Sequence, residues 1–249
     1  MEGERIGVNA IFLWAPYEHR FPKEGETIVA HTANGPKELE LGPCVHVKDY
    51  LKPDPERGSE REFVNMINTA HALGMKVIAQ LQVSLSTPGD FIYERHPEWL
   101  LQSIYGKPAL LWPWAMSRGG FRVNKAHPEL IRFVTDVIVP HWIKRWGVDG
   151  IYLDSPSMAY CDLHIKDLCR EVGCVKGAEP LTPIDGYFSP EPLVKAMRQR
   201  IDELEEETGR DLIFAGETTV KTWRDMPDEL IRAACRGKFF KWMLERAFQ

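Results

Sequence analysis

The sequence has no long apolar run. No stretch approaches the ~20 residues that a membrane-spanning helix needs, and the opening segment MEGERIGVNA lacks the apolar centre of a secretion signal. We therefore expect a cytoplasmic protein with no membrane partner. The five cysteines are an odd number at uneven spacing, which argues against the disulfide framework of a small secreted protein.

Clustered positive charge is also lacking. The formal net charge is -5, whereas a nucleic-acid surface needs gathered Lys and Arg, so no nucleic-acid partner is expected. Gly147, Gly150 and Gly216 do not have the spacing of a phosphate-binding loop. The cysteines between positions 161 and 174 lack the paired C-x-x-C pattern of structural zinc sites. We therefore expect neither a cofactor nor a metal.

Apolar segments alternate with helical patterns along the chain. The predicted strands cover residues 6–14, 76–83, 150–153 and 211–215. The predicted helices cover residues 60–73, 129–146 and 192–208, each followed by a glycine. This alternation indicates an α/β fold with a parallel sheet covered by helices, either a barrel or a doubly wound sheet. We expect a single domain over residues 1–249.

Two acidic residues stand where predicted strands end. Asp154 follows the strand in GVDGIYLDSP, and Glu217 follows the strand in DLIFAG. Ligands bind at the carboxyl ends of parallel strands in both candidate folds, so the two acids can meet at one mouth. Two facing carboxyl groups can cleave a glycosidic bond, one as nucleophile and one as proton donor. Otherwise they are turn or helix-cap residues, for which acids are also favoured.

Four stretches resemble the alpha-amylase-type glycoside hydrolases, in the order in which that family has them. GVNAIFLWAPYEH is similar to an early strand and loop, and VHVKDYLKPDPERGSEREFVNMINTAHALGMKVIAQLQV to the Asp-Tyr, helix and strand that follow. FRVNKAHPELIRFVTDVIVPHWIKRWGVDGIYLD resembles the helix and strand that lead to the nucleophile. LIFAGETTVKTW resembles the strand that carries the acid/base glutamate.

The resemblance implies a (β/α)8 TIM-barrel-like fold, with Asp154 as nucleophile and Glu217 as general acid/base. The implied activity is that of a retaining glycoside hydrolase or transglycosylase, which acts on a glucan-like oligo- or polysaccharide through a covalent glycosyl-enzyme. Such pairs of carboxyl groups lie ~5–5.5 Å apart. The alternatives are a non-catalytic carbohydrate-binding relative and a different barrel hydrolase.

The sequence departs from the family pattern at several points. Tyr152 stands where the family has an arginine, and Gln80, Ser84 and Leu85 replace its Asp-x-x-x-Asn-His motif. The late His-Asp motif has no counterpart before Gln249.

The strands match the second to fifth of eight, so the barrel is either partial or modified. Residues 26–32 and 43–47 are candidates for additional strands, and self-association is another way to cover an open edge.

Aromatic and polar residues near the strand ends are candidate sugar contacts. Residues 84–127 form a predicted loop insertion after the third strand, rich in aromatic residues. Such side chains stack on the apolar faces of sugars, or else they supply the loop's own small core. Tyr50 corresponds to the tyrosine of the family's Asp-Tyr. The candidate substrate-binding residues are Tyr50, Tyr152, Gln80, Trp112, Trp114 and His19.

Overall fold

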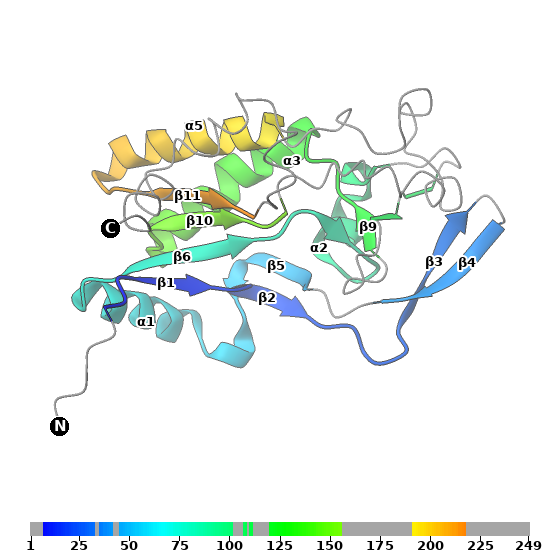
Figure 1. Cartoon of the computed structure of the whole chain (residues 1–249), viewed down its shortest axis with the longest axis horizontal. Coiled ribbons are helices and arrows are strands. Elements are labelled where there is room, and N and C mark those ends of the chain that lie inside the picture. The colour runs from blue at the N-terminus through cyan, green and yellow to red at the C-terminus, as the bar shows by residue number, and fades with distance from the viewer. Residues whose placement is uncertain are drawn as a thin grey trace.

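The centre of the molecule is a four-stranded parallel sheet (Figure 1). The computed structural model describes residues 7–32, 35–41, 45–101, 107–108, 110–111, 120–155 and 191–217. The sheet has the order β1-β6-β10-β11, with β1 at Ala10–Leu13, β6 at Lys76–Leu81, β10 at Gly150–Leu153 and β11 at Ile213–Gly216. These are the four strands predicted from sequence. Over the described residues the sheet is open, which agrees with the partial barrel that was one of the two expectations.

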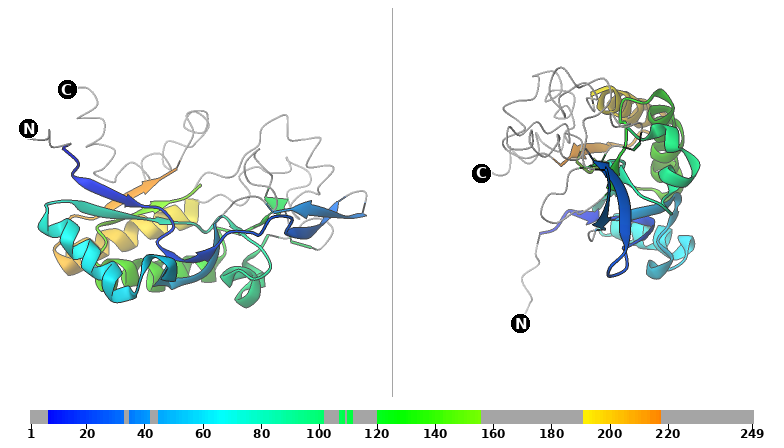
Figure 2. Two further views of the ribbon diagram at one scale, coloured as in Figure 1. Left: turned by 90° about the horizontal axis from the view of Figure 1, so that it is seen from below. Right: turned by 90° about the vertical axis from the view of Figure 1, so that its right-hand side faces the viewer.

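Helices cover one face of this sheet (Figure 2). Helix α1 (Glu60–Ala72) begins at Ser59, whose side chain and that of Glu62 form a reciprocal capping box. Helix α5 (Glu191–Thr208) precedes β11. The helix predicted over residues 129–146 begins as α3 (Pro128–Arg132) and continues in the π-helical segments η3 (Phe133–Ile138) and η4 (His141–Trp146).

The core lies between the sheet and these helices. Ile151 and Leu153 of β10 and Phe214 of β11 are buried on the helix side. Each such aliphatic or aromatic side chain contributes ~1.5–3 kcal/mol when fully buried. Because strand side chains alternate between faces, Phe12 and Tyr152 lie on the opposite face, where Phe12 is 49% exposed.

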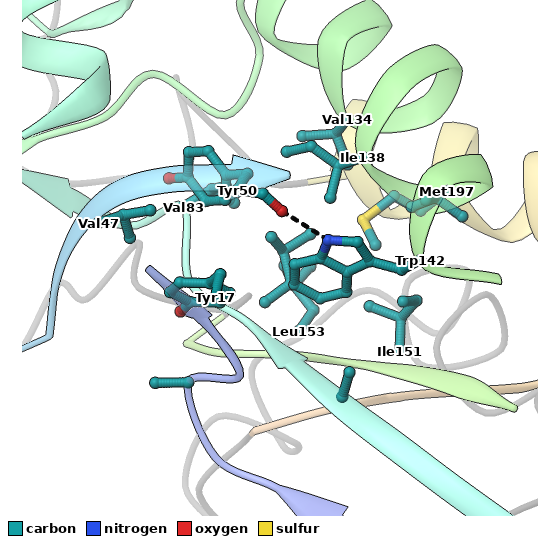
Figure 3. Close-up of a cluster of buried hydrophobic side chains, with 14 of the residues drawn as sticks. Tyr17, Val47, Tyr50, Val83, Val134, Ile138, Trp142, Ile151, Leu153 and Met197 are labelled. Carbon is teal, nitrogen blue, oxygen red and sulfur yellow. Dashed lines mark hydrogen bonds between the residues drawn. The ribbon is translucent and has the colours of Figure 1, made fainter. Parts of the chain in front are cut away.

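Buried aromatic side chains join the core to the segment that follows β1 (Figure 3). Trp142 is fully buried and donates from Nε1 to the Tyr50 carbonyl oxygen at 2.7 Å. Its ring stacks on Tyr17 with 5.6 Å between centroids. Strand β5 (His46–Pro53), which carries Tyr50, is thereby fixed to η4.

The additional strands predicted from sequence belong to separate antiparallel sheets. Strand β2 (Tyr17–Arg20) pairs with β5 (His46–Pro53), and β3 (Thr27–Thr32) pairs with β4 (Gly35–Glu40). Segment 26–32 thus contains a strand and segment 43–47 ends in one, as predicted, but neither strand joins the main sheet. A third small sheet contains β7 (Leu85–Ser86), β8 (Leu110–Leu111) and β9 (Gly120–Arg122).

The short helices lie in the connections. They are η1 (Pro55–Arg57) before α1, and α2 (Phe91–Arg95) and η2 (Pro97–Trp99) after β7. In the part of the chain that the structure describes, no helix is both long and apolar enough to cross a bilayer.

A buried carboxylate ties the amino ends of the strands together. Asp149 Oδ2 accepts from the Val77 amide at 2.8 Å and from His71 Nε2 at 2.7 Å, and Oδ1 accepts from Arg210 at 2.8 Å. Burial would raise the pKa of Asp149, but the hydrogen bonds from Arg210, Val77 and His71 lower it overall. This network links α1, β6, β10 and the start of β11 opposite the strand ends that carry Asp154 and Glu217.

Candidate active site

The strand register places Asp154 and Glu217 side by side. Leu153 of β10 pairs with Gly216 of β11, and each acid is the next residue of its strand. The ladder continues past the strands, because the Glu217 amide donates to the Leu153 carbonyl at 3.0 Å. The Asp154 amide donates to the Leu81 carbonyl at 2.8 Å, which fixes Asp154 to β6 as well. The sheet therefore brings the two acids together at one edge, as we expected from the sequence.

One hydroxyl bridges the two carboxyl groups. Ser155 Oγ lies 3.0 Å from Asp154 Oδ1 and 3.0 Å from Glu217 Oε2. The two oxygens are therefore no more than about 6 Å apart, below the ~6.5–9.5 Å separation of inverting pairs. Ser155 has a φ of 46°, a left-handed conformation that is uncommon for residues other than glycine. This strained turn aims its side chain between the acids.

The two acids shift each other's pKa. Burial and then the neighbouring Glu217 raise the pKa of Asp154 to about 7. The hydrogen bond from Asp154 lowers the pKa of Glu217, and Ser155 adds to this effect. The two carboxyl groups therefore titrate as one coupled pair, whose upper pKa lies near neutral pH.

Tyr152 and Phe12 form an aromatic wall beside the acids. Their rings meet edge to face with 5.0 Å between centroids. Burial, Glu217 and then Asp154 raise the pKa of Tyr152 to about 12, so its hydroxyl remains a donor across the neutral range. Trp14, at the end of β1, is 44% exposed and stacks on Phe21 at 5.9 Å. Sequence reasoning missed Phe12 and Trp14, because it gives no indication that the face of β1 opposite the helices is open.

Three other predicted contacts have partners within the protein. Tyr50 is 1% exposed, and its hydroxyl donates to the Gln82 carbonyl at 3.0 Å. Gln80 Oε1 accepts from the Ala15 amide at 2.9 Å and so fixes the corner after β1. His19 Nδ1 donates to the Tyr17 carbonyl at 2.8 Å.

Two predicted contacts, Trp112 and Trp114, lie outside the described residues. Among the predicted substrate-binding residues that the structure does describe, Tyr152 is the one with a direct electrostatic interaction with both acids.

Nothing in the described ranges gathers ligands for a metal. No group of three His, Cys, Asp or Glu side chains there could hold an ion. A hollow of about 780 Å³ opens at the start of α1, where it is lined by charged residues that include Glu60 and Arg145. Neither Asp154 nor Glu217 lines this hollow, so it is separate from the acid pair.

Comparison with known proteins points to one group of enzymes. No protein-family model matches the chain. A cyclomaltodextrin glucanotransferase of Geobacillus stearothermophilus is 23% identical over 175 residues, which covers 60% of this chain and 23% of that protein. An alpha-amylase from Lactobacillus plantarum superposes with a TM-score of 0.58 at 16% identity, over 91% of this chain and 43% of its own. A noncanonic maltogenic alpha-amylase from Thermotoga neapolitana gives 0.53 at 20% identity, over 88% and 40%.

The chain spans less than half the length of each of these relatives. The solved structures share its fold, with parallel strands followed by covering helices. The chain therefore resembles, in divergent and partial form, the catalytic barrel of the alpha-amylase-type glycoside hydrolases.

Proposed function

We propose that the chain carries the acid pair of a retaining glycoside hydrolase or transglycosylase that acts on a glucan-like saccharide. The observation that carries this proposal is the meeting of Asp154 and Glu217 at adjacent strand ends, bridged by one hydroxyl. Their upper separation of about 6 Å suits a direct attack on the sugar better than the water-mediated attack of inverting enzymes.

The reaction divides into two displacements. Asp154 attacks the anomeric carbon and forms a glycosyl ester, while Glu217 gives its proton to the departing glycosidic oxygen. Water or a second sugar hydroxyl then attacks the same carbon, Glu217 takes up the proton, and Asp154 leaves as carboxylate. The first step starts with one proton on the pair, held by Glu217, and the second step starts with Glu217 ionised.

The aromatic wall supplies a surface for the sugar. The apolar face of a pyranose ring packs well on aromatic side chains, and Phe12 and Tyr152 present such a surface next to the acids. Tyr152 also offers a hydroxyl donor to a sugar oxygen. In this proposal Trp14 extends the same platform beyond the end of β1.

Turnover of activated aryl glucosides tests the assignment. We expect Asp154→Asn and Glu217→Gln each to lower kcat at least ~100-fold, since general acid–base catalysis alone contributes 10²–10⁴. Asp136→Asn is the matched control. Asp136 is an exposed acid on η3, one of the helical segments that cover the sheet. Wild-type turnover in either site variant contradicts the proposal.

One observation favours the non-catalytic alternative. Burial and the neighbouring Glu217 raise the pKa of Asp154, which opposes the ionised state that a nucleophile needs. A carbohydrate-binding relative would show heat of binding with maltooligosaccharides in calorimetry but no turnover of any aryl glycoside. Turnover that is lost in Asp154→Asn excludes this alternative.

A further inference from the structure

Two aromatic rings stand exposed just past the ends of β1 and β2. Trp14 follows β1 and is 44% exposed, and Phe21 follows β2 and is 48% exposed. The rings stack with 5.9 Å between centroids and 16° between planes. We call Trp14 and Phe21 the distal aromatic pair. Large aromatic side chains serve core packing or binding, and the exposure of both rings leaves binding.

The backbone holds Trp14 in its exposed position. Ala15, the next residue, is fully buried with a φ of 42°, in the left-handed region that residues other than glycine rarely adopt. Its amide donates to Gln80 Oε1 at 2.9 Å, and the Trp14 carbonyl oxygen accepts from Arg57 Nη1 at 2.8 Å. Strained backbone persists where its surroundings fix it, and it clusters at functional sites. Across the described residues, the other non-glycine residue with a positive φ is Ser155, beside the acid pair.

A buried histidine supports both rings. The His19 ring meets Trp14 edge to face at 6.3 Å and Phe21 at 5.3 Å. The His19 side chain is 5% exposed, with Nδ1 3.7 Å from Asp54 Oδ2, and Arg57 Nε lies 3.3 Å from the same oxygen. The distal aromatic pair therefore rests on a packed base and is organised before a ligand arrives, which limits the entropy that binding costs.

The strand register places this pair on the same face of the sheet as the acids. Leu13 and Ile151 both pair with Ala79 of β6. Trp14 and Tyr152, the next residues, therefore lie at the same level on either side of β6. Leu13 packs against the core, and because strand side chains alternate, Trp14 lies on the open face, as Tyr152 does. Adjacent strands are ~4.8 Å apart, which puts the Trp14 and Tyr152 backbones roughly 10 Å apart across the sheet.

The exposed aromatic area is too small for a protein interface. Aromatic side chains present ~150–250 Å² each, so Trp14, Phe21 and Phe12, at 44%, 48% and 49% exposure, offer roughly 300 Å². A stable protein interface needs about 800 Å² from each partner. Flat rings of this extent, held rigidly, match the apolar face of a pyranose ring instead.

We infer that the distal aromatic pair is a separate saccharide subsite, which binds a pyranose unit remote from the one at Asp154 and Glu217. A chain long enough to reach both places gains contacts at each, whereas a single glucose unit contacts only one. The protein should therefore bind a maltooligosaccharide more tightly than glucose. The inference rests on the proposed function for the glucan-like ligand, but the binding that it describes requires no cleavage.

Oxidation of exposed tryptophan by N-bromosuccinimide, followed by peptide mass spectrometry, locates the ligand. The experiment uses Asp154→Asn, so that maltoheptaose is not consumed. We expect maltoheptaose at roughly ten times its Kd to slow the oxidation of Trp14 about 10-fold by mass action, while glucose at the same concentration has little effect. Trp142 is fully buried and is the internal control for folding. Oxidation of Trp14 that does not slow with maltoheptaose, whether or not the sugar binds elsewhere, overturns the inference.

Calorimetry on variants measures the contribution of each ring. Trp14→Ala should weaken maltoheptaose binding about 10-fold or more, and Trp14→Phe should restore most of the affinity because it keeps an aromatic ring. Val137→Ala is the matched control, because Val137 is an exposed apolar residue on η3. Wild-type affinity in folded Trp14→Ala overturns the inference, as does an equal loss of affinity for glucose. If Trp14→Ala does not fold, Phe21→Ala and the oxidation experiment decide.

These measurements separate the inference from the proposed function. If Asp154→Asn retains wild-type turnover of aryl glucosides, the proposed function fails, while protection of Trp14 still reports the subsite. If turnover is lost as proposed and Trp14 is not protected, the inference alone fails. Protection of Trp14 that rises with protein concentration in the absence of sugar would show that a second copy of the chain covers the rings, which also overturns the inference.

Discussion

Substitution of Gly150 by alanine tests how closely the strands carrying the two acids approach each other. A Cβ at position 150 would lie 2.5 Å from the Ile213 carbonyl oxygen and 2.7 Å from the Ile213 Cβ. Carbon atoms in optimal contact are ~3.5–4.0 Å apart, so β11 must move away from β10 by about 1 Å. The affected ladder includes the bond from the Ile213 amide to the Asp149 carbonyl at 2.8 Å.

The cost of this movement follows from two contributions. Overpacking of a tight contact costs ~1–3 kcal/mol, and loss of one ladder hydrogen bond adds ~0.5–1.5 kcal/mol. We expect Gly150→Ala to lower the free energy of unfolding by about 2–4 kcal/mol. Activity should fall further, since a displacement of ~1 Å between reacting groups can cost ~100-fold in rate.

Urea denaturation followed by tryptophan fluorescence measures the stability change. Gly7→Ala is the matched control, because a Cβ at position 7 meets nothing within 4 Å, and its effect should stay within ~0.5 kcal/mol. If Gly150→Ala is as stable as Gly7→Ala, β10 and β11 do not approach as described. The pairing of these strands, which places the two acids side by side, would then be wrong.

Three other changes probe the remaining parts of the structure. Asp149→Asn should cost ~3–5 kcal/mol, since it leaves the Arg210 guanidinium without its carboxylate. The lowered pKa of Asp149 stabilises the fold above the ordinary carboxyl pKa and is lost as pH falls through the folded value, so the variant should lose less stability in acid titration than the wild type. Trp142→Phe should cost ~1–3 kcal/mol in thermal or urea unfolding, because the buried Tyr50 carbonyl loses its donor. The pH profile of kcat/KM should be bell-shaped and fall above about pH 7, where the coupled acid pair loses its proton; a profile flat to pH 9 would show that the pair needs no proton.

The sheet could be predicted from sequence because its signals are local. Apolar runs bounded by turns fix β6 and β10, and the alternation of strand and helix implies that both run in parallel. Asp154 and Glu217 follow directly, since parallel strands end at one edge of a sheet. The four strands were therefore predicted in the correct order, although their limits differ by a few residues.

Other features depend on three-dimensional packing that the sequence does not display. From the sequence, the aromatic ring of Tyr50 could equally face the mouth or the core. In the structure it is 1% exposed and contacts the rings of Tyr17, Phe91 and Phe133. The π-helical segments η3 and η4 have the apolar spacing of an ordinary helix. No sequence motif marks Lys125 as buried. It is 6% exposed because the neighbouring backbone is hydrogen-bonded to Ser84 and Trp99.

The central claim is that Asp154 and Glu217 divide the work of a double displacement. A fluorinated glucosyl fluoride that slows breakdown of the covalent intermediate tests it, with mass spectrometry of the proteolysed protein. The account predicts one added glycosyl group, on the peptide that contains Asp154, and no added group in Asp154→Asn. Labelling of any other carboxyl group, or turnover with no covalent intermediate on Asp154, would contradict it.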